Sequence, residues 1–255
     1  MIRVGLLGTG RIGSLHAETI ASSRESTLDL VADVDDESAK KLAAQFGAAV
    51  KPSDEIISDP NIDAILIATS TDTHSDFIEK AAAAGKAIFC EKPVDLSLAR
   101  AKKCLEKVSA KNNSIMIGFN RRFDPNFAQL KKSLDDSEIG KSELLTITSF
   151  DPAPPPISYV KKSGGLYRDM MIHDFDLSNF MMGELPVTIS AVGQSLVDLE
   201  IGAAGDVDTA VVTMVYADGK IAVVKNSRRA SYGYDQRIEI LGSEGLLQAE
   251  NILEN

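Results

Sequence analysis

The chain has 255 residues, which is enough for two modest domains with separate cores. Hydrophobic residues make up 44% and charged residues 25%, an ordinary composition for a globular protein. The net charge of −10 disfavours nucleic acid and anionic lipid as partners, and no apolar run is long enough to cross a bilayer. The start of the chain enters a strand directly, which predicts no secretory signal. Two cysteines fit a reduced, cytoplasmic protein better than a disulfide-bonded one.

Short apolar strands alternate with helices up to about residue 120. This alternation is typical of βαβ units and predicts a doubly wound parallel sheet with both faces covered. The predicted strands are Arg3–Leu7, Leu28–Asp33, Ala64–Ala68, Ala87–Cys90 and Ile115–Gly118. The predicted helices are Ile12–Ser22, Glu37–Phe46, Asp76–Ala84 and Ser97–Ala110, the third preceded by a capping box of Thr73 and Asp76.

The pattern changes in the second half of the chain. Asp124 before Pro125 predicts a helix start, and Gly164-Gly165 leads into a helix that Gly183 ends after Met182. A strand and an extended linker, Leu144–Phe150 and Asp151–Pro156, lie between these helices. The remaining predicted strands are Val187–Val197, Thr209–Tyr216, Ile221–Asn226, Gln236–Leu241 and Leu246–Ala249. We therefore predict an α/β chain: a dinucleotide-binding domain over residues 1–120, then an α+β domain over 121–255 with a large, mainly antiparallel open sheet.

A glycine-rich turn joins the first strand to the first helix in Gly8-Thr-Gly-Arg-Ile-Gly13. In such a turn the first glycine makes the bend, the second admits a pyrophosphate, and the third allows close helix–strand packing. Asp33 ends the second strand, where an acid meets the adenosine ribose. The glycine turn, the helix that it opens and the acid at the end of the second strand together predict a dinucleotide site.

Asp33 also bears on the choice of cofactor. Its carboxylate accepts hydrogen bonds from a free ribose hydroxyl, whereas a 2′-phosphate there meets like-charge repulsion, to which Asp35 adds. Arg11 is the nearby cation that could offset this repulsion. The sequence therefore predicts NAD in preference to NADP.

The three histidines of the chain each lie beside a motif. His16 belongs to the cofactor helix, which favours a structural or phosphate-side role over catalysis. His74 follows the loop after the third predicted strand of the first domain, where open α/β sheets place their ligands. For His74, a place beside the nicotinamide and a place in a helix cap both remain open.

His173 follows Asp169 by four residues, which places both on one face of a helix. Oxidation of a secondary alcohol needs a base for the hydroxyl proton, a role that histidine suits, and a carboxylate beside it stabilises the charged ring. Lys92, at the carboxyl end of a strand, could orient the hydroxyl and stabilise charge on its oxygen. The alternatives are an exposed loop lysine, a surface Asp–His pair, and a metal site of Asp169, His173, Asp174 and Asp176.

Five motifs in this order resemble the glucose–fructose oxidoreductase / inositol dehydrogenase / rhizopine-catabolism oxidoreductase family. They are Gly8–His16, Ala68–His74, Glu91-Lys92-Pro93, Gly118–Asp124 and Gly164–Asp176. The resemblance extends from residue 2 to the end of the chain. Two later stretches, Gly202–Thr209 and Asn226–Asp235, are similar to the inositol dehydrogenases of this family.

The resemblance implies oxidation of a ring hydroxyl of myo-inositol or a similar cyclic polyol to a ketone, with hydride passing to NAD. It implies Lys92, Asp169 and His173 as catalytic residues, and it implies substrate contacts at Asn120, Arg121, Asp151 and Tyr234. The predicted cofactor contacts are Gly8, Gly10, Arg11, Ile12, Gly13, Asp33, Thr69, Thr71, His74, Glu91 and Lys92.

The resemblance also implies a homotetramer formed through the exposed face of the second domain's sheet. Members of the family usually continue past the point that corresponds to Asn255 with further strand and helix, so we expect this chain to be either a fragment or a shortened homologue. Two other functions remain open at this point. One is a sugar or dihydrodiol dehydrogenase of the same family, and the other is a protein that senses NAD without catalysis.

Overall fold

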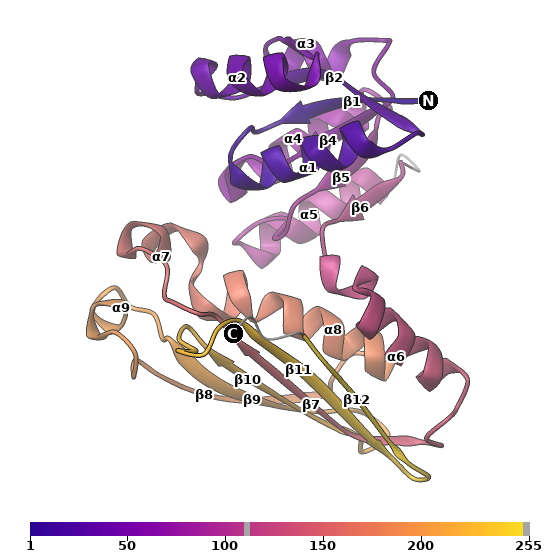
Figure 1. The fold of residues 1–255 in the computed structure, drawn as a ribbon, viewed down its shortest axis with the longest axis vertical. Coiled ribbons are helices and arrows are strands. Elements are labelled where there is room, and N and C mark those ends of the chain that lie inside the picture. Colours follow the sequence, from indigo (N-terminus) through magenta and orange to yellow (C-terminus); the bar gives the residue numbers. More distant parts are fainter. Residues whose placement is uncertain (110–112, 252–255) are drawn as a thin grey trace. The chain divides into compact units, whose positions relative to one another are not determined.

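The computed structural model describes residues 1–109 and 113–251, and its chain forms two compact units that meet in sequence at Gly118 and Phe119 (Figure 1). The boundary expected from the sequence falls after residue 120. Each unit has its own sheet and its own hydrophobic core.

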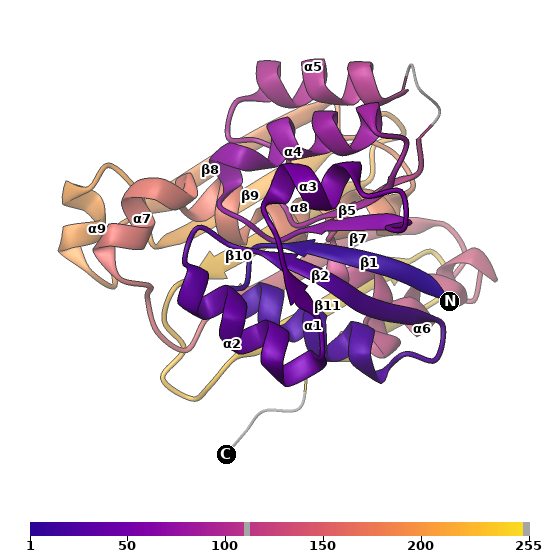
Figure 2. The ribbon, with the colours of Figure 1, turned by 90° about the horizontal axis from the view of Figure 1, so that it is seen from above.

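The first unit is built on a parallel sheet of order β3-β2-β1-β4-β5-β6. Helices α1 and α2 cover one face and α3, α4 and α5 cover the other (Figure 2). The strand order reverses between β1 and β4, and ligands bind at such a switch point in open α/β sheets. The strands are β1 Ile2–Leu7, β2 Ser26–Ala32, β3 Ala49–Val50, β4 Ala64–Ile67, β5 Ala87–Cys90 and β6 Ile115–Ile117. The helices are α1 Arg11–Ser22, α2 Asp36–Phe46, α3 Ser53–Ser58, α4 Thr71–Ala83 and α5 Leu98–Ser109.

The five strands and four helices predicted for this unit are present, but β3 and α3 had no prediction. β3 has two residues, both exposed, so it carries no apolar run. α4 begins at Thr71 rather than at Asp76. The capping box is therefore wrong: Thr73 lies inside the first turn, where its hydroxyl donates to the carbonyl of Ser70. The β-branched threonines hide the start of the helix, because they are weak helix formers. The predicted end of α5 at Ala110 lies outside the described residues.

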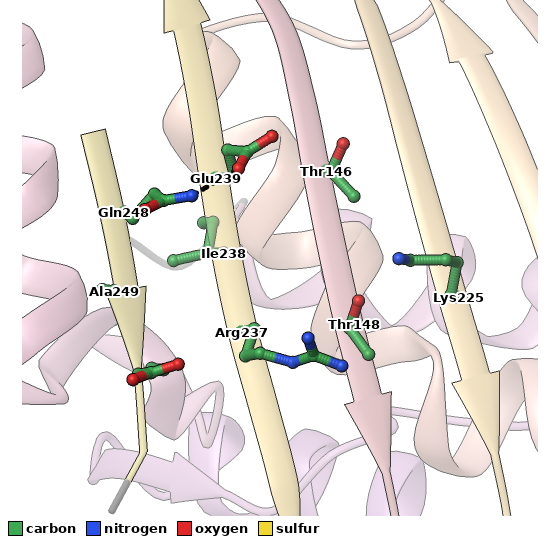
Figure 3. A pocket seen from close by; sticks show the side chains of 9 residues that line it. Thr146, Thr148, Lys225, Arg237, Ile238, Glu239, Gln248 and Ala249 are labelled. Atoms are coloured by element: carbon green, nitrogen blue, oxygen red, sulfur yellow. Dashed lines mark hydrogen bonds between the residues drawn. The ribbon is translucent and has the colours of Figure 1, made fainter. Parts of the chain in front are cut away.

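The second unit has a mixed sheet of order β12-β11-β7-β10-β9-β8, in which only β7 and β10 are parallel neighbours among the described strands. Helices α6 and α8 pack on one face, and their apolar side chains join those of the strands in a single core. The opposite face carries polar side chains (Figure 3). The strands are β7 Ser142–Phe150, β8 Thr188–Gln194, β9 Thr209–Val215, β10 Ile221–Ser227, β11 Asp235–Gly242 and β12 Leu246–Glu250. The helical segments are η1 Asn120–Phe123, α6 Pro125–Asp135, α7 Ile157–Ser163, η2 Leu166–Met170, α8 Ile172–Met182 and α9 Leu199–Ala203.

The predicted helix from Gly164 to Met182 is interrupted. Gly164 and Gly165 have φ values of +90° and +79°, which end α7 and start a new segment. That segment, η2, is a π turn, in which the N–H of Met171 donates to the carbonyl of Leu166 at 2.9 Å. α8 follows and ends before Gly183, as predicted.

The first strand after α8 is shorter than predicted, because a buried carboxylate takes over its backbone donors. Asp208 accepts hydrogen bonds from the N–H groups of Leu196, Val197 and Asp198, each at 2.9 Å. This draws the chain out of β8 after Gln194 and into α9. Burial acts to raise the pKa of Asp208, but these hydrogen bonds outweigh it, so the pKa lies below its usual value.

The cap of α6 gives a test of this fold. The Asp124 carboxylate accepts from the N–H groups of Asn126 (2.9 Å) and Phe127 (3.1 Å). We expect Asp124→Ala to lower the free energy of unfolding by about 1 kcal/mol, because it removes the acceptor for these amides. Asp124→Asn keeps an acceptor and should lose far less. Urea denaturation measures both variants, and equal losses would contradict the capping role.

Candidate active site

Glycine is needed at the three positions of the β1–α1 turn for different physical reasons. Gly8 has φ +94°, and a Cβ there would lie 2.4 Å from the carbonyl oxygen of Ala68. A Cβ on Gly13 would lie 2.0 Å from the carbonyl oxygen of Gly8. A Cβ on Gly10 would meet nothing within 4 Å. Gly8 and Gly13 are therefore required by packing, whereas Gly10 leaves open space at the start of α1.

That open space suits a pyrophosphate. Gly10 is the N-cap of α1, and no side chain of the described residues caps this helix start. The first N–H groups of a helix have no partner inside it, and the helix dipole places positive potential there. The residues present thus fit the phosphates of a dinucleotide at Gly10, Arg11 and Ile12.

Asp33 lies next to this turn and is held in an ionised, half-buried state. Its carboxylate accepts from the N–H of Thr9 (2.5 Å), the hydroxyl of Thr9 (3.0 Å) and the N–H of Asp35 (3.0 Å). Burial acts to raise the pKa of Asp33, and these hydrogen bonds outweigh it, so the pKa is lowered. The charge suits ribose hydroxyls and repels a 2′-phosphate, as NAD preference requires.

His74 ties two loops of the first unit together. Its side chain is buried, with Nδ1 2.8 Å from the carbonyl oxygen of Pro93 and Nε2 3.0 Å from that of Thr69. The Thr69 hydroxyl also bonds the hydroxyl of Thr73 at 2.7 Å. His74 therefore fixes the loop after β4 against the loop after β5. A direct cofactor contact by His74, Thr69 or Thr71 stays a prediction.

Glu91, the residue before Lys92, is linked to the cofactor helix α1 through His16. His16 Nε2 lies 2.7 Å from Glu91 Oε1, and the His16 ring packs edge-on against Phe89 with centroids 5.1 Å apart. A Cβ on Gly118 would lie 3.1 Å from the same carboxylate, which explains the glycine after β6. His16 thus has the structural role left open by the sequence. Lys92 follows at the end of β5, with a cis peptide bond to Pro93.

Asp169 and His173 lie on different helical segments of the second unit. Asp169 is on the π turn η2, where it accepts a hydrogen bond from the hydroxyl of Tyr159 at 2.9 Å. His173 is in the first turn of α8 and packs edge-to-face on Phe119, with centroids 6.4 Å apart. The expectation of one regular helix carrying both residues is therefore wrong, because the wider π turn precedes α8. Their catalytic pairing stays a prediction.

The other two acids of this region are bound by arginines. Asp174 is completely buried and pairs with Arg121. Asp176 accepts two hydrogen bonds from Arg122, at 2.8 and 2.5 Å. These contacts occupy two carboxylates of the metal site considered as an alternative. Within residues 1–109 and 113–251, no group of three acidic, histidine or cysteine side chains could hold a metal ion.

Arg121, one of the four predicted substrate contacts, is buried. It is 8% exposed, and besides Asp174 it donates to the hydroxyl of Ser149 at 3.1 Å. With the Gln236 amide in the orientation that satisfies its neighbours, Gln236 Oε1 accepts from Arg121 Nη2 (2.6 Å), Arg121 Nε (2.7 Å) and the Tyr234 hydroxyl (2.9 Å). Arg121 is thus engaged inside the protein, and these contacts indicate that it supports Tyr234.

Asp151 lies beside Tyr234 by strand register. Phe150 of β7 pairs with Asp235 of β11, so the residues next to this pair, Asp151 and Tyr234, are neighbours at the end of the sheet. Burial raises the pKa of Asp151, while the charges of Arg228 and Arg121 oppose the rise. The fourth predicted contact, Asn120, is exposed at the start of η1. Substrate contact by these four residues stays a prediction.

Comparison with known proteins identifies the family. Residues 2–119 match the oxidoreductase family with an NAD-binding Rossmann fold, and residues 127–248 match the GFO/IDH/MocA C-terminal domain. The chain belongs to this family. The predictions of family, of α/β fold class, of an oxidoreductase and of NAD as the cofactor are confirmed.

Relatives with high identity are inositol dehydrogenases by name. The inositol 2-dehydrogenase of Rhizobium meliloti is 50% identical over 250 residues, which cover 98% of this chain and 76% of the relative. The myo-inositol 2-dehydrogenase of Thermotoga maritima is 46% identical over 99% of this chain and 76% of its own length. The Lactobacillus casei scyllo-inositol dehydrogenase structure with bound NAD(H) and scyllo-inositol has a TM-score of 0.91 at 30% identity, over 98% of this chain and 76% of that one. Within the described ranges, no helix has both the length and the apolar character needed to span a membrane.

The glycine turn predicts opposite outcomes for two alanine variants. Gly10→Ala should leave the melting temperature unchanged and weaken NAD binding at least tenfold, because its Cβ fills the space for the phosphates. Gly13→Ala should lower the melting temperature, because its Cβ collides with a backbone oxygen. Thermal melts and NAD titration measure both effects. Equal behaviour of the two variants would contradict the separate roles.

Asp151 predicts a pH-dependent stability. A carboxyl whose pKa is raised by folding contributes stability below its unfolded pKa, and that contribution is lost as pH rises through the folded pKa. The uncharged variant Asp151→Asn escapes this loss. Its free energy of unfolding should therefore increase relative to the parent chain as the pH rises above about 4. Denaturation curves across this range measure the difference, and parallel pH dependences would contradict the raised pKa.

Proposed function

We propose that the chain is an NAD-dependent inositol 2-dehydrogenase, which oxidises a ring hydroxyl of myo-inositol or a similar cyclic polyol to a ketone. The observation that carries the proposal is the 50% identity to a named inositol 2-dehydrogenase over 98% of this chain. The ligands in the L. casei relative, NAD(H) and scyllo-inositol, support the same cofactor and substrate class.

The first unit would hold the cofactor through its glycine turn. The N–H groups at the start of α1 would bind the pyrophosphate, Gly10 would admit it, and the ionised Asp33 would accept hydrogen bonds from the adenosine ribose. NAD, when bound, supplies the acceptor for the hydride that leaves the alcohol carbon. The contact between Glu91 and His16 would hold the end of β5 against α1 while the cofactor is bound.

Three side chains would handle the substrate hydroxyl. His173 is proposed as the base that takes the hydroxyl proton, with Asp169 as the carboxylate that stabilises the charged ring. Lys92 is proposed to orient the hydroxyl and to stabilise negative charge on its oxygen. Tyr159 holds Asp169 through a hydrogen bond of 2.9 Å, which restricts the rotation of that carboxylate.

The proposed polyol contacts are Asn120, Asp151 and Tyr234, with Arg121 behind them. An amide, a carboxyl and a phenol provide both donors and acceptors, as a ring of neighbouring hydroxyls requires. Arg121 would act through Gln236, which binds both its guanidinium and the Tyr234 hydroxyl. Selectivity among isomers would then depend on these side chains.

We further propose that the open face of the second sheet is where subunits of a homotetramer meet, as the resemblance implies. Figure 3 shows that Thr146, Thr148 and Lys225 point from neighbouring strands into a shallow depression on this face. On the same face, the paired apolar side chains of Val192 on β8 and Val211 on β9 are 68% and 45% exposed, which favours a covered surface.

Replacement of His173 tests the proposed chemistry. His173→Ala should abolish NADH formation, because no base remains for the hydroxyl proton, while the dissociation constant for NAD stays within about twofold of the parent value. NADH absorbance with myo-inositol, scyllo-inositol, glucose and xylose measures turnover, and calorimetry measures NAD binding. Loss of NAD binding in the variant would contradict the role of His173. Absence of NADH from the whole panel with the folded parent chain would reject the proposed function.

A further inference from the structure

The buried side chain of Arg228 has no role in the function proposed so far. It is 2% exposed, one of the largest fully buried side chains among the described residues. Its Nε and Nη2 atoms have no hydrogen-bond partner within the described part of the chain. Burying a guanidinium is expensive unless opposite charges surround it, so this arginine needs an explanation.

Strand register places Arg228 at the end of the sheet that carries Asp151. β10 runs parallel to β7 with Ser227 opposite Phe150, so the next residues, Arg228 and Asp151, lie side by side. The N–H of Asp151 donates to the carbonyl of Ser227 at 2.9 Å, and the N–H of Arg228 donates to the carbonyl of Asp208 at 2.8 Å. The backbone of Arg228 is therefore fixed between β7 and β9.

Two carboxylates face the guanidinium at nearly equal distances. Nη2 of Arg228 lies 3.8 Å from Oδ2 of Asp169 and 3.9 Å from Oδ2 of Asp206. Both distances exceed hydrogen-bond length but allow strong attraction between charges in a buried place. Arg228 thus compensates two acids from different segments at once.

Asp206 in turn holds the π turn that carries Asp169. Its two carboxylate oxygens accept from the N–H of Leu166 at 3.0 and 3.1 Å. A Cβ on Gly165 would lie 2.4 Å from the Asp206 carboxylate, so the glycine allows this close approach. The contacts form a closed circuit: Asp206 holds the start of η2, Arg228 attracts Asp206, and Arg228 also attracts Asp169 on η2.

We infer that Arg228 is a positioning residue, which holds the Asp169 carboxylate in place and balances its charge during polyol oxidation. This inference rests on the proposed function. Arg228 is too deeply buried to reach the substrate, so it acts through Asp169. It also explains two sequence stretches, Gly202–Thr209 and Asn226–Asp235, because the first carries Asp206 and the second carries Arg228.

The charged groups of this region set the direction of the expected effect. Asp151, Asp169 and Asp206 lie around Arg228, Asp208 contacts its backbone, Tyr159 binds Asp169, and Arg121 and Asp174 pair nearby. Loss of the Arg228 charge leaves excess negative potential, which favours protonation of the proposed base. The acidic limb of the pH profile should then move to higher pH.

The test compares four variants in the full chain, with the pH profile of kcat/KM for myo-inositol at saturating NAD as the main measurement. Arg228→Met keeps the apolar stem and removes the charge. We expect it to move the acidic limb up by roughly one pH unit and to lower kcat/KM below that limb about tenfold, with the dissociation constant for NAD unchanged. Arg228→Lys should restore most of the profile. Arg229→Met, which removes the same charge from the exposed neighbour, should match the parent chain.

Asp206→Asn provides an opposite displacement. It removes a negative charge and keeps an oxygen for the N–H of Leu166, so the acidic limb should move to lower pH. Structural damage alone would not raise the acidic limb in Arg228→Met and lower it in Asp206→Asn. If Arg228→Met does not fold, the pH profiles of Asp206→Asn and Arg228→Lys decide the test.

Arg228→Met and Arg229→Met with the same profile, or Asp206→Asn with an unmoved limb, would overturn the inference. A parent chain that forms no NADH from the polyol panel would instead reject the proposed function. The inference is then decided by carbon NMR of the carboxyl signal that Asp169→Asn removes. At neutral pH this signal should shift in Arg228→Met relative to the parent chain and stay in place in Arg229→Met, and an unmoved signal in Arg228→Met would reject the inference.

Discussion

The completely buried carboxylate of Asp174 is the constraint on which the second unit depends. A carboxylate removed from water must be matched by donors, and here they come from three segments: Arg121 of η1, Ser149 of β7 and Asn226 of β10. The bonds from Ser149 and Asn226 are 2.7 and 2.8 Å long. One acid on α8 thereby fixes the helix to the sheet at the end where the proposed polyol contacts lie.

The same principle extends outward from Asp174. Arg121 turns its other nitrogens to Gln236, which reaches Tyr234, and Arg228 stands between further carboxylates. The sheet brings these groups together, because β11, β7 and β10 are neighbouring strands. β7 and β10 end, and β11 begins, at the same end of the sheet. A buried network of polar side chains is rigid only when its charges are balanced and its hydrogen bonds are made. The same side chains therefore affect both the stability of the second unit and its proposed chemistry.

The sequence predicted most of the first unit because its signals are local. Gly8, Gly10 and Gly13 lie in one turn, and Asp33 directly follows the neighbouring strand β2, so spacing alone indicated the NAD site. The second unit was harder. The π turn escaped prediction because Asp169 and His173 keep a spacing that also suits an α-helix. Asp208 shortened β8 through a contact between residues ten and more positions apart, which no local pattern reveals.

The burial of Arg228 is a second feature that the sequence alone does not reveal. In the sequence it is one of two adjacent arginines, and nothing in the pair indicates which is buried. The alternation of β10 decides this, since Asn226 and Arg228 face inward while Ser227 and Arg229 do not. The family resemblance supplied the proposed catalytic residues, but the charges around them become visible only in three dimensions.

The π turn between Gly165 and Met171 has a consequence for changes in chain length. Its closing bond spans five residues, one more than in an α-helix, so the turn contains an extra residue in effect. Deletion of one residue would let it relax into a regular α-helix and rotate Asp169 about the axis by roughly 100° relative to α8. The length of this segment is therefore constrained by its closing bond. Insertions and deletions among related sequences should therefore fall outside it, in loops such as the one before α7.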